Sequence, residues 1–118
     1  MRLLLDQSLP QALVATSVEG LSIERWSESG LADAELVTVA AERGFDGVVF
    51  LGPSVLARDN VTKAAREAGI LLVATSADDP VSAQRDITRH MHTIARHTTG
   101  GSVLVLSHEV RTVEPTQV

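Results

Sequence analysis

Acidic side chains follow several apolar segments of this sequence, at positions where they could hold a metal ion. Asp6 ends the run RLLLD, and Asp78 and Asp79 follow the run ILLVATSA. Asp33 and Glu35 lie between these runs and open an Ala-rich segment. Carboxylate oxygens suit Mg²⁺ or Mn²⁺, and crowded carboxylates need a cation to offset their mutual repulsion. An ion held in this way could activate a water molecule and neutralise the charge of a phosphodiester.

Most of these acids also have a structural interpretation. Asp33 and Asp79 stand where helices are expected to begin, and Asp is favoured at an N-cap because its oxygen accepts a backbone N–H bond. Glu35 would lie in a first helical turn, where the helix dipole favours a negative charge. Asp6 is less easily explained, because Ser8 is the better cap for the helix expected after it. Capping and metal binding therefore both remain open for Asp79, whereas the capping interpretation does not explain Asp6.

The elements that must position these acids alternate along the chain. Apolar runs and turn residues predict strands at 2–6, 21–26, 47–51, 70–75 and 102–107, with the second strand near a sheet edge. Helical spacing and end signals predict helices at 9–19, 33–43, from 59 or 60 to 68, and from 79 to about 97. Buried strands alternating with helices predict an α/β fold, a three-layer α/β/α sandwich around a mostly parallel, Rossmann-like sheet of about five strands.

Ligands of such sheets bind beyond the carboxyl ends of the strands, near the point where the strand order reverses. Four groups of residues follow predicted strands and should lie at that edge: Asp6, Gly52 to Ser54, Ser76 to Asp79, and Ser107 to Glu109. Whether the acids converge on one site depends on the strand order, which the sequence does not give.

Two segments resemble compact PIN-like domains. LLLDQSLP is similar to the opening of that family, and GLADAELVTVAAERGFDGVVFL is similar to its next block. The resemblance covers residues 1–52 and continues afterwards only in topology. It implies a PIN-like fold and a Mg²⁺- or Mn²⁺-dependent ribonuclease of a family that includes toxins of toxin–antitoxin pairs, with RNA as substrate and an antitoxin-like partner. It makes Asp6 a metal ligand and places Asp33 and Glu35 on the second acidic position of the family.

The sequence departs from this family after the third predicted strand. The family has an Asp there, often with a second Asp two residues later, whereas this chain has Gly52 and Ser54. Asp78 and Asp79 could supply the missing charge. The catalytic set would then be Asp6, Glu35, Asp78 and Asp79, with Asp6, Asp33, Glu35 and Asp79 as metal ligands. Alternatively the site is degenerate, and the domain is a protein-interaction or oligomerisation module that forms a homo-oligomer.

Other motifs give weaker indications. Arg85 and Arg89 are one helical turn apart and could contact a phosphate backbone or an acidic partner protein. His90, His92 and His97 share one expected helix, but their spacing does not suit a zinc site. LGPS lacks the glycines and lysine of nucleotide-binding turns, and nothing near Ser54 supports a catalytic triad.

Composition limits the remaining possibilities. A chain of 118 residues with 44% apolar residues suits a single domain, expected at 1–110 with a tail at 111–118. The net charge is −5, so nucleic acid would need a local basic surface or a bridging cation. There are no cysteines and no apolar run long enough for a membrane span, which favours a cytoplasmic protein without a membrane partner.

Overall fold

The structure is a computed structural model that describes residues 1–16, 18–26, 30–97 and 101–113. The elements of these residues, in chain order, are β1 (Arg2–Leu5), the 3₁₀-helix η1 (Gln11–Ala15), β2 (Ser22–Arg25), α1 (Asp33–Glu42), β3 (Gly47–Phe50), the 3₁₀-helix η2 (Ser54–Ala57), α2 (Asp59–Ala68), β4 (Leu71–Thr75), α3 (Pro80–Arg89), α4 (Met91–Ala95), β5 (Ser102–Val105) and β6 (Val110–Val113). None of the helices in these ranges is both long enough and apolar enough to span a membrane.

The strands form one six-stranded sheet in the order β2-β1-β3-β4-β5-β6. The strands β1 to β5 pair with one another in parallel, and β6 pairs antiparallel with β5. This confirms the predicted α/β fold with a mostly parallel sheet and the predicted edge position of the second strand. The order reverses at β1 and β3, because β2 lies on one side of β1 and all later strands lie on the other.

The sixth strand was not expected from the sequence. Two of its four residues, Arg111 and Thr112, are exposed and polar, so Val110–Val113 lack the apolar run of the central strands. The strand forms because Leu106 donates its backbone N–H to the Glu109 carbonyl across the turn, which brings the chain back along β5. Three residues of the expected tail, 111–113, therefore belong to the sheet, and residues 114–118 lie outside the described part of the chain.

The two central strands, β3 and β4, are buried along their whole length. Gly47 begins β3 at the closest approach of these strands. A Cβ atom at this position would lie 2.6 Å from the carbonyl oxygen of Leu71 and 2.9 Å from Cδ2 of Leu3. Only glycine fits here, because both neighbours belong to paired strands that cannot move independently.

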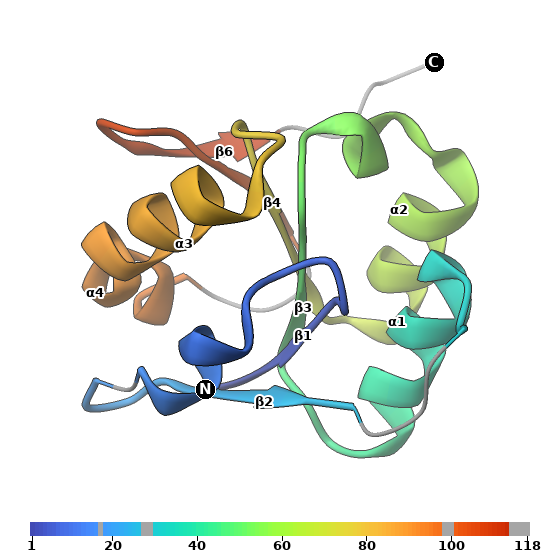
Figure 1. Cartoon of the computed structure of the whole chain (residues 1–118). Helices are drawn as coiled ribbons and strands as arrows, with labels where there is room; N and C mark the ends of the chain where they lie inside the picture. The colour runs from blue at the N-terminus through green and yellow to red at the C-terminus, as the bar shows by residue number, and fades with distance from the viewer. Residues whose placement is uncertain (17, 27–29, 98–100, 114–118) are drawn as a thin grey trace.

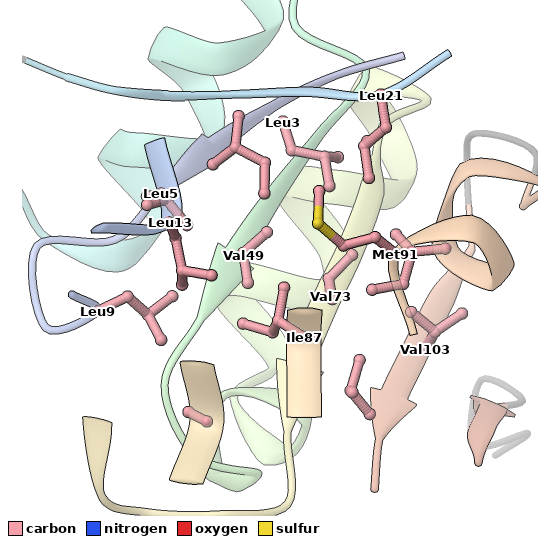
Figure 2. Packing of buried hydrophobic residues seen from close by; sticks show 14 of the residues in the cluster. Leu3, Leu5, Leu9, Leu13, Leu21, Val49, Val73, Ile87, Met91 and Val103 are labelled. Atoms are coloured by element: carbon pink, nitrogen blue, oxygen red, sulfur yellow. The ribbon is translucent and has the colours of Figure 1, made fainter. Parts of the chain in front are cut away.

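Figure 1 shows α3 and α4 on one side of the strands and α1 and α2 on the other, and the buried apolar residues form two core clusters. Successive strand side chains point to opposite faces, so Leu3 and Leu5 enter one core and Leu4 enters the other. In the first core, strand residues and η1 pack against Ile87 of α3 and Met91 of α4, as Figure 2 shows. The second core contains residues of α1 and α2, including Leu36, Val37, Ala40, Val61 and Ala65.

The helix predicted at 9–19 is wrong, because the structure contains only the short 3₁₀-helix η1. The Leu9 carbonyl, which a helix from residue 9 would use internally, accepts a hydrogen bond from the Arg25 side chain instead. The Leu13 amide donates to the Pro10 carbonyl, the three-residue spacing of a 3₁₀-helix. Ser8 therefore caps no helix, contrary to the prediction.

Three other predicted helix boundaries also differ. Ala32 and Arg58 are the N-caps of α1 and α2, and the expected caps Asp33 and Asp59 are the first helical residues. The long helix predicted from residue 79 divides at His90 into α3 and α4. The His90 amide is shared between two carbonyls, those of residues 86 and 87, which tightens the end of α3. The three histidines of the expected helix consequently do not share one helix.

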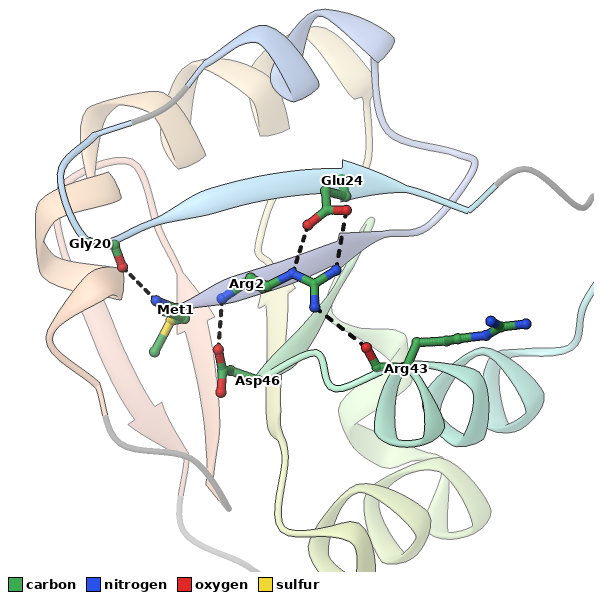
Figure 3. Close-up of polar contacts among 6 residues, drawn as sticks. All are labelled: Met1, Arg2, Gly20, Glu24, Arg43 and Asp46. Carbon is green, nitrogen blue, oxygen red and sulfur yellow. Dashed lines mark hydrogen bonds and ion pairs between the residues drawn. The ribbon is translucent and has the colours of Figure 1, made fainter.

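Polar contacts fix the edge of the sheet at the amino ends of the strands (Figure 3). The Arg2 side chain donates from Nε to Glu24 at 2.9 Å, and the Arg2 backbone amide donates to Asp46 Oδ2 at 2.7 Å. The hydrogen bond with Arg2 lowers the pKa of the Glu24 carboxyl. These contacts tie β1 to β2 and to the start of β3.

Candidate functional site

The carboxyl ends of the parallel strands place the predicted acids on one edge of the sheet. Asp6 directly follows β1, and its backbone amide continues the pairing with β3 through a 2.9 Å bond to the Val49 carbonyl. Asp6 is half-buried and lies at the reversal of strand order between β1 and β3. This is the place where α/β sheets bind ligands, so the predicted position of Asp6 is reproduced.

Gly52 and Asp78 meet where β3 and β4 end. Gly52 has a φ of +82°, a conformation that favours glycine. A Cβ atom built on Gly52 would lie only 3.0 Å from Oδ1 of Asp78. The Asp78 carboxylate therefore occupies the space that a side chain at position 52 would enter. Of the two acids expected to replace the charge missing at position 52, Asp78 is the one that lies there.

Thr75, which the sequence analysis did not single out, holds this corner together. It is fully buried at the end of β4. Its Oγ1 accepts the Gly52 amide at 2.9 Å and donates to the Ala77 carbonyl at 2.9 Å. Both turns of the corner are thus fixed by one hydroxyl group. The available signal was a polar residue ending an otherwise apolar strand.

Asp33 forms an ion pair with Arg58. Asp33 is the first residue of α1, and Arg58 precedes α2 after the η2 turn, so the pair links the two helices that cover one face of the sheet. The Asp33 side chain is 26% exposed and that of Arg58 is 53% exposed. The guanidinium already supplies the positive charge that a metal ion would bring to this carboxylate.

Glu35 and Asp79 hold the beginnings of helices. Glu35 Oε1 accepts the backbone amide of Ala32, the N-cap of α1, at 3.0 Å. Asp79 is the N-cap of α3, and its Oδ2 accepts the Ser82 amide at 2.8 Å. This hydrogen bond from Ser82 lowers the pKa of the Asp79 carboxyl. The capping interpretation of Asp79 is therefore confirmed.

The five acids thus do not all share one function in the fold. The side chains of Asp6 and Asp78 make no hydrogen bond to any residue within the described ranges, whereas Asp33, Glu35 and Asp79 each do. Within those ranges, which include all five acids, no three His, Asp or Glu side chains are grouped so that they could hold a metal ion. The carboxyl edge therefore has two acids free to bind a ligand.

Arg25 is a second residue near the carboxyl ends of the strands that the sequence analysis missed, and its contacts are structural. Its guanidinium donates to Gln11 Oε1 at 2.9 Å, to the Gln7 carbonyl at 3.1 Å, and to the Leu9 carbonyl. These bonds attach the segment after Asp6 to the end of β2. An Arg at the end of an alternating strand was the only signal, and it does not identify the acceptors.

Arg85 and Arg89 lie on α3, away from the acids at its beginning. At 1.5 Å per residue, they are about 9 and 15 Å along the helix from Asp79. Arg85 Nε lies 3.4 Å from Oδ1 of the buried Asp86, and Arg89 Nη1 donates to the Ser107 carbonyl at 2.8 Å. The two predicted contact residues thus belong to a separate surface.

Comparison of the chain with known protein families, with curated proteins and with solved structures gave no significant match.

Proposed function

We propose that this chain is a PIN-like, three-layer α/β/α domain whose nuclease site is incomplete, and that it acts as a protein-interaction module. The ion pair between Asp33 and Arg58 is the observation that carries the proposal. Asp33 and Glu35 fall on the second acidic position of the resemblance, where a catalytic metal needs a carboxylate ligand. A divalent ion would have to displace Arg58, which would leave a guanidinium beside the cation.

Two further features support the same conclusion. Glu35, the other residue at the second acidic position, accepts the Ala32 amide and would lose that bond on turning toward a metal. Position 52 carries no side chain, in a backbone conformation that disfavours most residues. Two-metal phosphodiester hydrolysis depends on carboxylates that hold ions about 4 Å apart. Acids that cap helices or pair with arginine are not available to hold ions in this way.

A second candidate function is the Mg²⁺- or Mn²⁺-dependent ribonuclease. One observation favours it, since Asp78 Oδ1 lies 3.0 Å from the Cβ position of residue 52. Asp78 could therefore provide the charge that Gly52 lacks, with Asp6 on the neighbouring strand. In this case Asp6 and Asp78 would hold one ion, and RNA would be the substrate.

Calorimetric titration with Mn²⁺ distinguishes the two candidates. The interaction module is expected to give no saturable binding to the folded protein. Binding that is abolished in both Asp6→Asn and Asp78→Asn, but retained in the control Glu19→Gln, would overturn the proposal in favour of the nuclease. Glu19 suits the control because it is exposed in the turn before β2, at the opposite edge of the sheet. EDTA-sensitive RNA cleavage with the same mutational pattern would have the same meaning.

A further inference from the structure

The outer face of α3 presents a stripe of residues that the core does not use. The stripe consists of Val81, Gln84, Arg85, Thr88 and Arg89, which line an open hollow of about 600 Å³. Their spacing of three and four residues places them on one side of the helix, about 12 Å long. Val81 is 77% exposed, and it is the only large apolar side chain that is exposed among the residues the structure describes.

Each of the two arginines of this stripe is anchored by one hydrogen bond, and its other guanidinium donors are free within the described part of the chain. Arg85 is attached through Nε to Asp86, a carboxylate that is only 2% exposed. Arg89 is attached through Nη1 to the Ser107 carbonyl in the turn between β5 and β6. Their remaining guanidinium nitrogens make no hydrogen bond to a residue of the described ranges. A ligand would therefore meet two oriented cations that lose little side-chain entropy on binding.

We infer that this stripe binds an acidic segment of a partner protein, which rests on the interaction function proposed above. Arg85 and Arg89 are one helical turn apart, so they match two carboxylates spaced by one turn of a partner helix. An apolar side chain one further turn along would cover Val81. The stripe thus specifies both the charge and the spacing of its ligand.

A nucleic-acid backbone fits the same surface less well. Proteins that bind DNA tightly typically neutralise about 6–10 phosphates, whereas this stripe supplies only two arginines. Asp78 and Asp79 lie just before the helix, and the low pKa of Asp79 keeps it charged, so a longer polyanion would meet repulsion there. Exposed Val81 also has no counterpart on a phosphate chain.

The test uses the full chain and a fluorescein-labelled synthetic helical peptide with Glu pairs one turn apart beside Leu. Binding is followed by fluorescence anisotropy, and the site by amide chemical-shift changes. The matched probes are the same peptide with Gln in place of Glu and an oligouridylate of equal length. The Glu peptide is expected to bind and to shift the amides of residues 81–89. The Gln peptide, which loses both ion pairs, should bind about tenfold more weakly, at two- to fivefold for each exposed pair. The oligouridylate should also bind more weakly than the Glu peptide.

Substitutions locate the site. The double variant Arg85→Gln/Arg89→Gln should raise the Kd about tenfold, at two- to fivefold for each exposed ion pair. Val81→Ser should also weaken binding, and Arg66→Gln, on α2 across the sheet, should leave it unchanged. Equal binding by the wild type and the double variant, or no binding of the Glu peptide, would refute the inference. Arginine-dependent binding of oligouridylate alone would assign the stripe to RNA. These outcomes are independent of the Mn²⁺ titration, on which the proposed function depends.

Discussion

Placing an acid at position 52 tests how the carboxyl edge is built. Gly52 has a φ of +82°, and its Cβ position lies 3.0 Å from Asp78 Oδ1. In Gly52→Asp, two carboxylates would share a space that now holds one. We expect this variant to fold with reduced stability, and Gly52→Asn to lose less, because Asn has nearly the same shape without the charge.

The magnitude has two parts. A left-handed backbone costs a non-glycine residue about 1–2 kcal/mol, and Asp and Asn are among the residues that adopt it most readily. Two charges about 4 Å apart repel by about 1 kcal/mol in water and about 4 kcal/mol at an effective dielectric constant of 20. Because Asp78 is exposed, the repulsion should lie near the lower value. Gly52→Asn should therefore lose about 1–2 kcal/mol of unfolding free energy, and Gly52→Asp about 1–2 kcal/mol more.

Urea unfolding, monitored by far-UV circular dichroism and by the fluorescence of the single tryptophan, Trp26, measures both values. The Asp–Asn difference should shrink in 1 M salt, where the screening length is about 3 Å. Repulsion raises the pKa of the new carboxyl above its unfolded value. The penalty is therefore full at neutral pH and disappears as the pH falls below the unfolded pKa. Asp78→Asn should remove most of the difference in a double-mutant cycle.

Manganese adds a functional readout to the same variant. Two adjacent carboxylates can share a divalent ion, so Mn²⁺ should raise the urea midpoint of Gly52→Asp but not that of the wild type. The reasoning would be refuted if Gly52→Asp and Gly52→Asn were equally stable at every salt concentration. That result would place the Asp78 carboxylate elsewhere.

Three further predictions concern other parts of the fold. Gly47→Ala should lower the unfolding free energy by about 2–4 kcal/mol in urea, because its new methyl group would lie 2.6 Å from the Leu71 carbonyl oxygen. Asp79→Ala should lower the urea midpoint at pH 7, because it removes the carboxylate that accepts the Ser82 amide. The pKa of Asp79 is lowered in the folded state, so its stabilisation is present above the unfolded pKa and is lost as the pH falls through the folded pKa. Arg25→Gln should cost about 1–3 kcal/mol and accelerate amide hydrogen exchange in the segment after β1, which loses its guanidinium donor.

Each of these predictions has a matched control. Gly101→Ala should leave the unfolding midpoint unchanged, because nothing lies within 4 Å of its Cβ position; a similar loss in both glycine variants would contradict the close packing at Gly47. The Asp79→Ala and wild-type midpoints should converge in acid, and a constant gap would mean that the carboxylate charge is not involved. Arg25→Lys keeps the charge but not the forked donors, so it should resemble Arg25→Gln rather than the wild type.

The sequence alone determined features that depend on neighbouring residues. Continuous apolar runs such as GVVF and LLVAT identified buried parallel strands, and alternation in SIER identified an edge strand. Asp79 marked the start of a helix, which it caps, and the helix predicted to end at residue 68 does end there, before Gly69 in the left-handed conformation. Each of these signals acts within about one turn or one strand, so it survives without knowledge of the strand order.

Tertiary structure decided everything that joins distant segments. Asp33 and Arg58 are 25 residues apart, Arg25 and Leu9 are 16 apart, and Gly52 and Thr75 are 23 apart. These residues meet only because β1 and β3 pair, with β2 and β4 outside them. The same order leaves Asp6 at the reversal point and sets Asp78 beside Gly52. The type and spacing of an acid could therefore make it a candidate ligand. Whether that acid meets an arginine, a helix amide or no partner at all depends on the packing of the strands, whose order the sequence does not give.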